Sequence, residues 1–229
     1  MKKQATKIKI CGLTEEKEAD YLNQIHADFA GMVVFFPKSK RNISLDQAKK
    51  IKAALLPEIK TVAVTVSPTL AQISQIAEAG FDLIQIHGEP ADLDIKTAKS
   101  ICEYTNKLSL PILKAFNVSD IDSYNCWQSC PSVAGFVFDA AKPGSGKTFD
   151  WTLLKNLPRS KKLFMLAGGL MPENVSNAIC FLHPDGVDVS SGVEFIEKDR
   201  PGKDPYRIQA FAEAVQLADK QITSKYLSI

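Results

Sequence analysis

The chain has 229 residues, of which 45% are hydrophobic and 24% are charged, a composition ordinary for a globular protein with a sizeable core. The net charge is +2 with both signs interspersed, so there is no basic footprint for nucleic acid and no polybasic patch for a membrane surface. No apolar run approaches the ~18 residues of a membrane-spanning helix, and the basic N-terminus lacks the apolar core of a signal peptide. We therefore expect a cytoplasmic protein with reduced thiols.

The five cysteines show no spacing typical of a metal site or a redox motif. Cys126 and Cys130 have three residues between them and no neighbouring histidine, and no C-x-x-C motif occurs. We expect no metal, and we interpret Cys102, Cys126, Cys130 and Cys180 as helix-packing or loop thiols.

Short β-branched or aromatic runs recur along the chain and predict eight strands: 7–11, 29–35, 60–66, 81–87, 110–116, 133–139, 162–168 and 185–191. The segments between them have helical spacing and recognisable caps. Ser44 begins a capping box that ends at Gln47. Ser67, followed by Pro68, is predicted to cap the next helix, with the proline in the first helical position.

Strands that alternate with helices predict parallel βαβ units. Eight such units, each of about 28 residues, match the count that closes a (β/α)8 TIM barrel. No linker divides the chain, so we predict a single domain over residues 1–229. An open doubly wound sheet stays the alternative, because periodicity cannot distinguish the two.

A barrel of this kind carries its active site at the carboxyl ends of the strands. Polar residues and glycines lie in the last residues of the predicted strands or shortly after them: Cys11, Arg41, Gln85, His87, Lys114, Asp139, Gly168, Gly169, Asp188, Ser190, Ser191 and Gly192. Because side chains alternate along a strand, Gln85 and His87 share one face, which we expect to point inward, away from the helices. By the same alternation, Lys9 shares a face with Cys11.

Glycine-rich turns at 142–148, 166–170 and 189–194 follow the last three strands. Glycine lets backbone N–H groups approach a phosphate, and the loops after strands 7 and 8 of such barrels frequently bind one. We therefore expect a phosphate ligand there. The first turn also resembles a Walker A loop, but Ala141 stands where that pattern needs its first glycine.

The first and sixth strands end in groups that can transfer protons. Asp139 follows four apolar residues, and partial burial would raise its pKa toward the working pH of an acid. Cys11 needs the opposite shift to act as a thiolate, and Lys9 is a candidate cation to lower its pKa. Arg41 is either a carboxylate clamp or part of a solvated basic run, and His87 either contacts a ligand or a neighbouring strand.

The motifs KICGLT, QIHG, LKAF, FDA…GSGKTFDW, LAGGLMPENV and GVDVSSGVE, in this order, resemble the phosphoribosylanthranilate isomerase family of tryptophan biosynthesis, from about residue 7 to residue 215. The resemblance implies a cofactor-free Amadori rearrangement. N-(5-phospho-β-D-ribosyl)anthranilate becomes 1-(2-carboxyphenylamino)-1-deoxy-D-ribulose 5-phosphate. It further implies that Asp139 is the general acid that opens the ring and that Cys11 is the general base that removes the C2 proton.

The resemblance also implies which residues hold the substrate. Arg41 matches the family's carboxylate-binding arginine, and Asp188 lies near the reacting end. Gly169, Ser191 and Gly192 match the phosphate-binding turns.

The expected partner is a small phosphosugar, with no nucleic acid and no membrane, and the assembly is a monomer or a homodimer. Three alternatives stay open: another phosphosugar isomerase or epimerase on the same barrel, a non-catalytic barrel that binds a phosphate ligand, and a thiol-redox protein.

Overall fold

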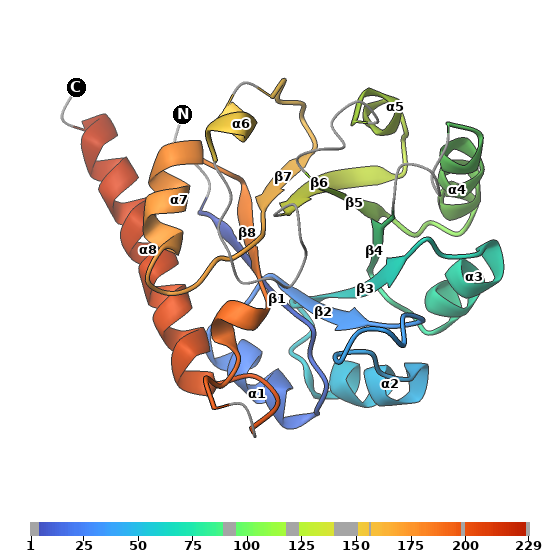
Figure 1. Cartoon of the computed structure of the whole chain (residues 1–229), viewed down its shortest axis with the longest axis horizontal. Coiled ribbons are helices and arrows are strands. Elements are labelled where there is room, and N and C mark those ends of the chain that lie inside the picture. The colour runs from blue at the N-terminus through green and yellow to red at the C-terminus, as the bar shows by residue number, and fades with distance from the viewer. Residues whose placement is uncertain are drawn as a thin grey trace.

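The computed structural model describes residues 5–88, 95–117, 124–139, 151–155, 157–197 and 200–227. Its strands form a closed barrel in chain order, with every strand parallel to its neighbours (Figure 1). The strands are β1 (Lys7–Cys11), β2 (Phe29–Val33), β3 (Lys60–Val66), β4 (Leu83–His87), β5 (Ile112–Asn117), β6 (Val133–Asp139), β7 (Leu163–Leu166) and β8 (Gly186–Val189). The first strand pairs with both β2 and β8, which confirms the predicted barrel and excludes an open sheet.

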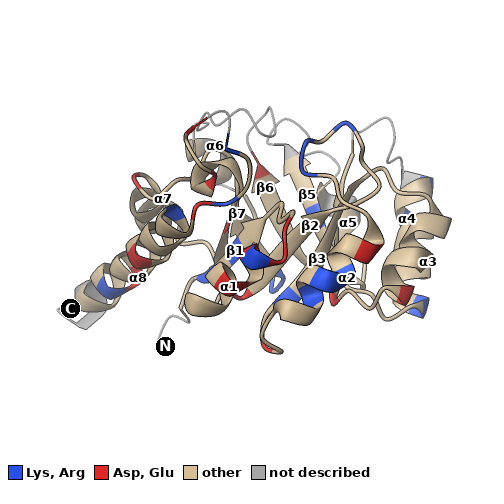
Figure 2. Cartoon of the chain, turned by 90° about the horizontal axis from the view of Figure 1, so that it is seen from below, with Lys and Arg blue, Asp and Glu red and all other residues tan. Residues whose placement is uncertain are grey.

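Helices surround the barrel on the outside (Figure 1). They are α1 (Lys17–Gln24), α2 (Leu45–Ala54), α3 (Leu70–Glu78), α4 (Ile95–Lys107), α5 (Tyr124–Gln128), α6 (Thr152–Lys155), α7 (Val175–Leu182) and α8 (Pro205–Leu227), and a 3-10 turn, η2 (Ser191–Val193), follows β8. None of the helices in the described part of the chain is long and apolar enough to cross a membrane. The side of the molecule in Figure 2 carries both signs of charge over its helices.

Two apolar layers separate the inside of the barrel from its outside. One lies between sheet and helices and includes Ile84 and Ile86, both fully buried. The other fills the barrel and consists of Phe29, Val33, Val62, Val64, Leu83, Leu113, Ala115, Val137, Met165 and Ala167. The predicted alternation along β4 is confirmed, because its isoleucines join the outer layer while Leu83 points inward.

The same alternation points Lys114 outward, although we expected it at the barrel mouth with the site residues. Its ammonium lies 4.6 Å from the centre of the Phe116 ring and 5.5 Å from that of Trp127. Both aromatic side chains belong to the outer layer. Lys114 therefore packs against the helices through cation–π contacts.

The helix caps match the prediction at one position and differ at another. Ser44 caps α2 as predicted, accepting a hydrogen bond from the backbone N–H of Gln47, but the predicted capping box is incomplete because the Gln47 side chain donates to the carbonyl oxygen of Thr14 instead. At α3 the predicted cap at Ser67 is wrong, since Thr69 closes a complete capping box with Gln72. Two polar residues near Pro68 each offer a cap, and the reciprocal bond to Gln72 favours Thr69.

The expectation that every thiol is reduced is wrong for one pair. Cys102 of α4 and Cys130, just after α5, form a disulfide with Cα atoms 6.1 Å apart. They are 28 residues apart in sequence, so their pairing arises only when α4 packs beside α5. Cys11 and Cys180 are free thiols.

Thiol titration in denaturant tests this disulfide. We expect five thiols per chain after reduction and two fewer before it. Closing a loop of this length restricts the unfolded chain, so reduction should lower the free energy of unfolding by about 3 kcal/mol. Cys102→Ser should reproduce that loss without reductant, whereas equal thiol counts before and after reduction would contradict the bond.

Candidate active site

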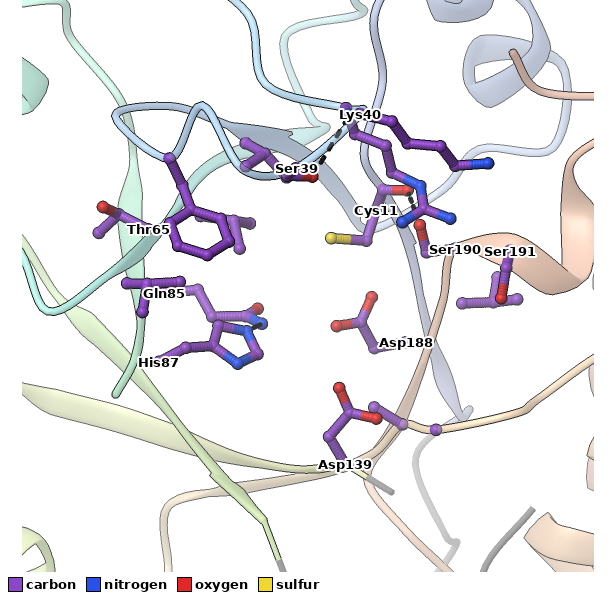
Figure 3. A pocket seen from close by; sticks show the side chains of 18 of the residues that line it. Cys11, Ser39, Lys40, Thr65, Gln85, His87, Asp139, Asp188, Ser190 and Ser191 are labelled. Atoms are coloured by element: carbon purple, nitrogen blue, oxygen red, sulfur yellow. Dashed lines mark hydrogen bonds between the residues drawn. The ribbon is translucent and has the colours of Figure 1, made fainter. Parts of the chain in front are cut away.

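A cavity of about 430 Å³ opens at the carboxyl ends of the strands. This volume lies within the range of small-molecule sites. Most of the predicted site residues line it: Cys11, Arg41, Gln85, His87, Asp139, Gly168, Gly169, Asp188, Ser190 and Ser191. Figure 3 shows the Cys11 thiol and the Asp139 carboxylate on opposite sides, with Asp188 between them. The barrel thus gathers side chains from its first and sixth strands around one space.

Cys11 is half-buried at the end of β1, and neighbouring residues leave room for its thiol. A Cβ on Gly31 of β2 would lie 3.0 Å from the Cys11 sulfur and 3.1 Å from Nζ of Lys9. A side chain at this position would crowd the thiol and the ammonium, which share the inner face of the barrel.

Lys9 makes a buried ion pair with Asp188. Its Nζ donates to Oδ2 of Asp188 at 2.8 Å, and the two side chains are 0% and 6% exposed. Burial would lower the pKa of Lys9, but the charges of Asp188 and Cys11 outweigh it and raise that pKa above its ordinary value. Lys9 is therefore held as a cation beside the thiol.

The predicted lowering of the Cys11 pKa is wrong in its net direction. Burial raises the pKa of the thiol above its ordinary value, while Lys9 opposes this increase and Asp188 adds to it. Lys9 does act as the predicted cation. Its effect is smaller than the cost of removing the thiolate from water among the surrounding residues.

Gln85 and His87 point inward from β4 (Figure 3). Nε2 of Gln85 donates to Nε2 of His87 at 2.8 Å. Burial, followed by the charges of Lys114 and Lys9, lowers the pKa of His87 to about 3. His87 is thus a neutral imidazole at physiological pH, and its contact with Gln85 lies within its own strand.

Thr65, Gln85 and Asp188 line the cavity, and each buries a side-chain oxygen that has no hydrogen-bond partner among the described residues. Within the described residues, neither Oε1 of Gln85 nor Oδ1 of Asp188 takes part in a hydrogen bond. Burying such atoms unpaired is costly, and polar groups of a ligand bound in the cavity would reduce that cost.

The glycine turns after β7 and β8 lie side by side. Gly168 and Gly169 have φ angles of +86° and +65°, which favour glycine. A Cβ on Gly192 would lie 1.9 Å from the carbonyl oxygen of Leu170, so the two turns contact each other directly. Gly192 itself lines a smaller neighbouring cavity of about 200 Å³ together with Gly169 and Ser191.

Arg41 lies at the cavity in an ion pair that the sequence did not predict. Its Nε donates to Oε1 of Glu194 at 2.5 Å, and Nζ of Lys40 donates to Oε2 at 2.9 Å. The buried Lys203 adds a third cation at 3.3 Å. The sequence did not point to Glu194 or Lys203. Glu194 is the last residue of the motif GVDVSSGVE, and Lys203 lies in the segment PGKD that follows shortly after it.

The turn at 142–148, with its partial Walker A pattern, lies outside the described residues. Among the residues that are described, no group of three or more His, Cys, Asp or Glu side chains is arranged to hold a metal ion.

The charges around Glu194 predict an acid-sensitive contribution to stability. Burial would raise the pKa of Glu194, but the hydrogen bond from Arg41 and the charges of Lys203 and Lys40 lower it from 4.5 to about 2. Its stabilisation is therefore complete above pH 4.5 and lost as the pH falls toward 2. Between pH 6 and pH 3, urea unfolding should show a loss on the order of 1–2 kcal/mol that Glu194→Gln lacks.

The matched control is Glu173→Gln, which removes a carboxylate that is 60% exposed. This control should lose as much stability in acid as the unchanged protein. An identical acid loss in Glu194→Gln would contradict the assignment.

The chain matches known proteins in both sequence and structure. Residues 8–214 match the family model of N-(5'-phosphoribosyl)anthranilate (PRA) isomerase. The N-(5'-phosphoribosyl)anthranilate isomerase of Acetivibrio thermocellus is 34% identical over 96% of this chain and 100% of its own length.

Solved structures agree with the sequence match. The crystal structure of phosphoribosyl anthranilate isomerase from Thermotoga maritima superposes with a TM-score of 0.76 at 34% identity, over 92% of this chain and 98% of that one. A phosphoribosyl anthranilate isomerase in complex with reduced 1-(o-carboxyphenylamino)-1-deoxyribulose 5-phosphate superposes with a TM-score of 0.73 at 31% identity, over the same shares of the two chains. The chain belongs to the phosphoribosylanthranilate isomerase family.

Proposed function

We propose that Cys11 and Asp139 perform the acid–base steps by which this chain isomerises N-(5'-phosphoribosyl)anthranilate in tryptophan biosynthesis. The observation that carries the assignment is their placement on opposite sides of one cavity (Figure 3), which Gly168 and Gly169 also line. Ring opening needs a proton on the ring oxygen, and rearrangement needs a proton removed from C2. One acid and one base on opposite walls can serve both atoms of a bound sugar.

The steps balance without a cofactor. Asp139 gives its proton to the furanose oxygen, the C1–O bond breaks, and the anilino nitrogen forms a C1=N double bond as an iminium. The Cys11 thiolate takes the proton from C2, and the released electron pair forms a C1=C2 bond while the nitrogen regains its lone pair. The resulting enolamine gains a proton at C1 and loses the proton of its C2 hydroxyl, which gives the ketone. The C1 proton comes from the Cys11 thiol, and the proton of the C2 hydroxyl passes to the Asp139 carboxylate, so both side chains return to the protonation states in which the cycle began.

The charges around Cys11 suit a base that is formed during the reaction. In the empty cavity burial raises the pKa of the thiol and favours its protonated form, so its proton must pass to solvent before Cys11 acts as a base. The iminium is a cation close to the thiol, so its formation favours the thiolate when the C2 proton must be removed. Lys9 adds a permanent positive charge on the same strand.

The remaining residues hold the substrate by charge and hydrogen bonds. The turns containing Gly168, Gly169, Ser190, Ser191 and Gly192 receive the phosphate. Arg41 receives the anthranilate carboxylate. The unpaired oxygens of Asp188 and Gln85 accept hydrogen bonds from sugar hydroxyls, while the neutral His87 orients Gln85. The location in the cytoplasm and the assembly as a monomer or homodimer stay predictions.

Substitution of the two proton-transfer groups tests the mechanism. Cys11→Ser and Asp139→Asn should each lower kcat by about 10²- to 10⁴-fold, because each removes one proton-transfer group. Loss of anthranilate fluorescence as the substrate is consumed measures the rate.

The matched controls are Cys180→Ser, at a free thiol on α7, and Asp46→Asn, whose carboxylate is 91% exposed. Both should keep the full rate. Full activity in both Cys11→Ser and Asp139→Asn would refute the mechanism.

A second prediction concerns the titration of Cys11, followed by the pH dependence of its alkylation with iodoacetamide. Lys9→Met should raise the pKa of the thiol further, because it removes the main charge that opposes the effect of burial. The double variant Lys9→Met/Asp188→Asn should raise it less, since Asp188 acts in the opposite direction. An unmoved titration in Lys9→Met would show that Lys9 does not influence the thiol.

A further inference from the structure

Glu194 connects two loops that are remote in sequence. It follows η2 at the end of β8, and its carboxylate is 14% exposed. Oε1 accepts from Nε of Arg41 at 2.5 Å and from Nζ of Lys203 at 3.3 Å. Arg41 comes from the loop after β2, 153 positions earlier. One carboxylate thus joins the loop after β2 to the loop after β8 at the cavity mouth.

Lys203 is buried in the protein interior and binds the carboxylate of Glu194 from that side. Its side chain is fully buried, and Nζ also donates to the carbonyl oxygen of Ser190 at 3.1 Å and to its hydroxyl at 3.2 Å. Its backbone N–H donates at 2.7 Å to Glu18, a buried residue of α1 that also accepts from Thr14 N–H at 2.6 Å. Since both the backbone and the side chain of Lys203 are bonded, its ammonium has little freedom to move.

The side chain of Arg41 has little space on its other side. Its Cδ lies 2.4 Å from the point where a Cβ on Gly12 would stand, and Gly12 has a φ of +79°. Ser190, which contacts Lys203, donates to the carbonyl oxygen of Cys11 at 2.8 Å. Packing and hydrogen bonds therefore fix Arg41 relative to the end of β1.

A guanidinium carries five N–H groups, and the contact with Glu194 uses the one on Nε. Within the described residues, no hydrogen bond or ion pair involves the two Nη atoms of Arg41. These atoms form the pair that binds a carboxylate in a bidentate manner. Because the Glu194 carboxylate binds Nε, both Nη groups stay available to another carboxylate, and their orientation is restricted.

We propose that Glu194, anchored by Lys203, is a positioning residue that holds Arg41 by Nε and thereby presents both Nη groups to the carboxylate of the substrate. The proposal rests on the role given to Arg41 in the proposed function. It assigns Glu194 to substrate discrimination rather than to proton transfer. Glu194 therefore affects the binding of a carboxylated substrate and has little effect on an analogue without that group.

The test compares two substrates, ribose 5-phosphate condensed with anthranilate and with aniline, with product formation followed by chromatography. Glu194→Gln should raise KM for the anthranilate substrate about tenfold, as expected for a weakened charged hydrogen bond, and should change kcat little. KM for the aniline substrate should stay the same. Arg41→Met should show the same selectivity, and the double variant should be no worse than Arg41→Met, because the two residues act as one unit.

Matched variants exclude a general structural effect. Glu173→Gln removes a carboxylate that pairs with Arg207 outside the main cavity and should leave both KM values unchanged. Lys203→Met should give the same selective increase as Glu194→Gln, and Lys203→Arg should restore most of it. If Glu194→Gln does not fold, Glu194→Asp keeps the charge, shortens the reach toward Arg41 and should give a smaller increase of the same kind.

Two results would contradict the positioning role of Glu194 while leaving the role of Arg41 intact. One is an equal rise in KM for both substrates in Glu194→Gln. The other is a double variant whose effect equals the product of the two single effects. A different result would overturn the role of Arg41 itself, and the inference with it: an Arg41→Met variant that binds the anthranilate substrate as well as the unchanged protein does. Loss of kcat in Cys11→Ser is independent of all three outcomes.

Discussion

The closure of the barrel between β1 and β8 is the constraint on which the site depends. These strands are parallel neighbours, with Lys9 opposite Asp188 and Ile10 opposite Val189. The register brings together residues that are 179 positions apart, and a 2.8 Å ion pair joins them inside the barrel. The same closure places Ser190 against the backbone of Cys11. Without it, the thiol would lie at the edge of an open sheet, far from both Asp188 and the glycine turn of β8.

Burial of charge gives the barrel mouth its chemical character. Removing Lys9 and Asp188 from water is costly, and the attraction within such pairs often does no more than balance that cost. The pair is therefore better understood as a means of holding charges beside Cys11 than as a source of stability. The second group, Glu194 with Lys40, Arg41 and Lys203, has more cations than anions. It leaves positive charge where a phosphorylated, carboxylated substrate would enter.

Regular elements were predictable where local pattern and packing agree. The predicted bounds of β1, β3 and β6 equal the observed ones, because alternation and β-branched residues act within each strand. The cap of α3 was not predictable, since Ser67 and Thr69 both suit the position and only the bond to Gln72 distinguishes them. The disulfide was not predictable for a similar reason. Cys102 and Cys130 have no informative spacing and meet through the packing of α4 and α5.

The pattern of residues along the chain predicted eight strand–helix units and placed Cys11, His87 and Asp139 at the ends of strands that reach one rim. It also predicted which side chains of β4 point inward, because the alternation of side chains along a strand does not depend on the neighbouring strands. Tertiary structure alone decided the direction of the Cys11 pKa, because desolvation depends on every element that surrounds the thiol. It also decided the partner of Arg41, because Glu194 approaches it only when the barrel closes.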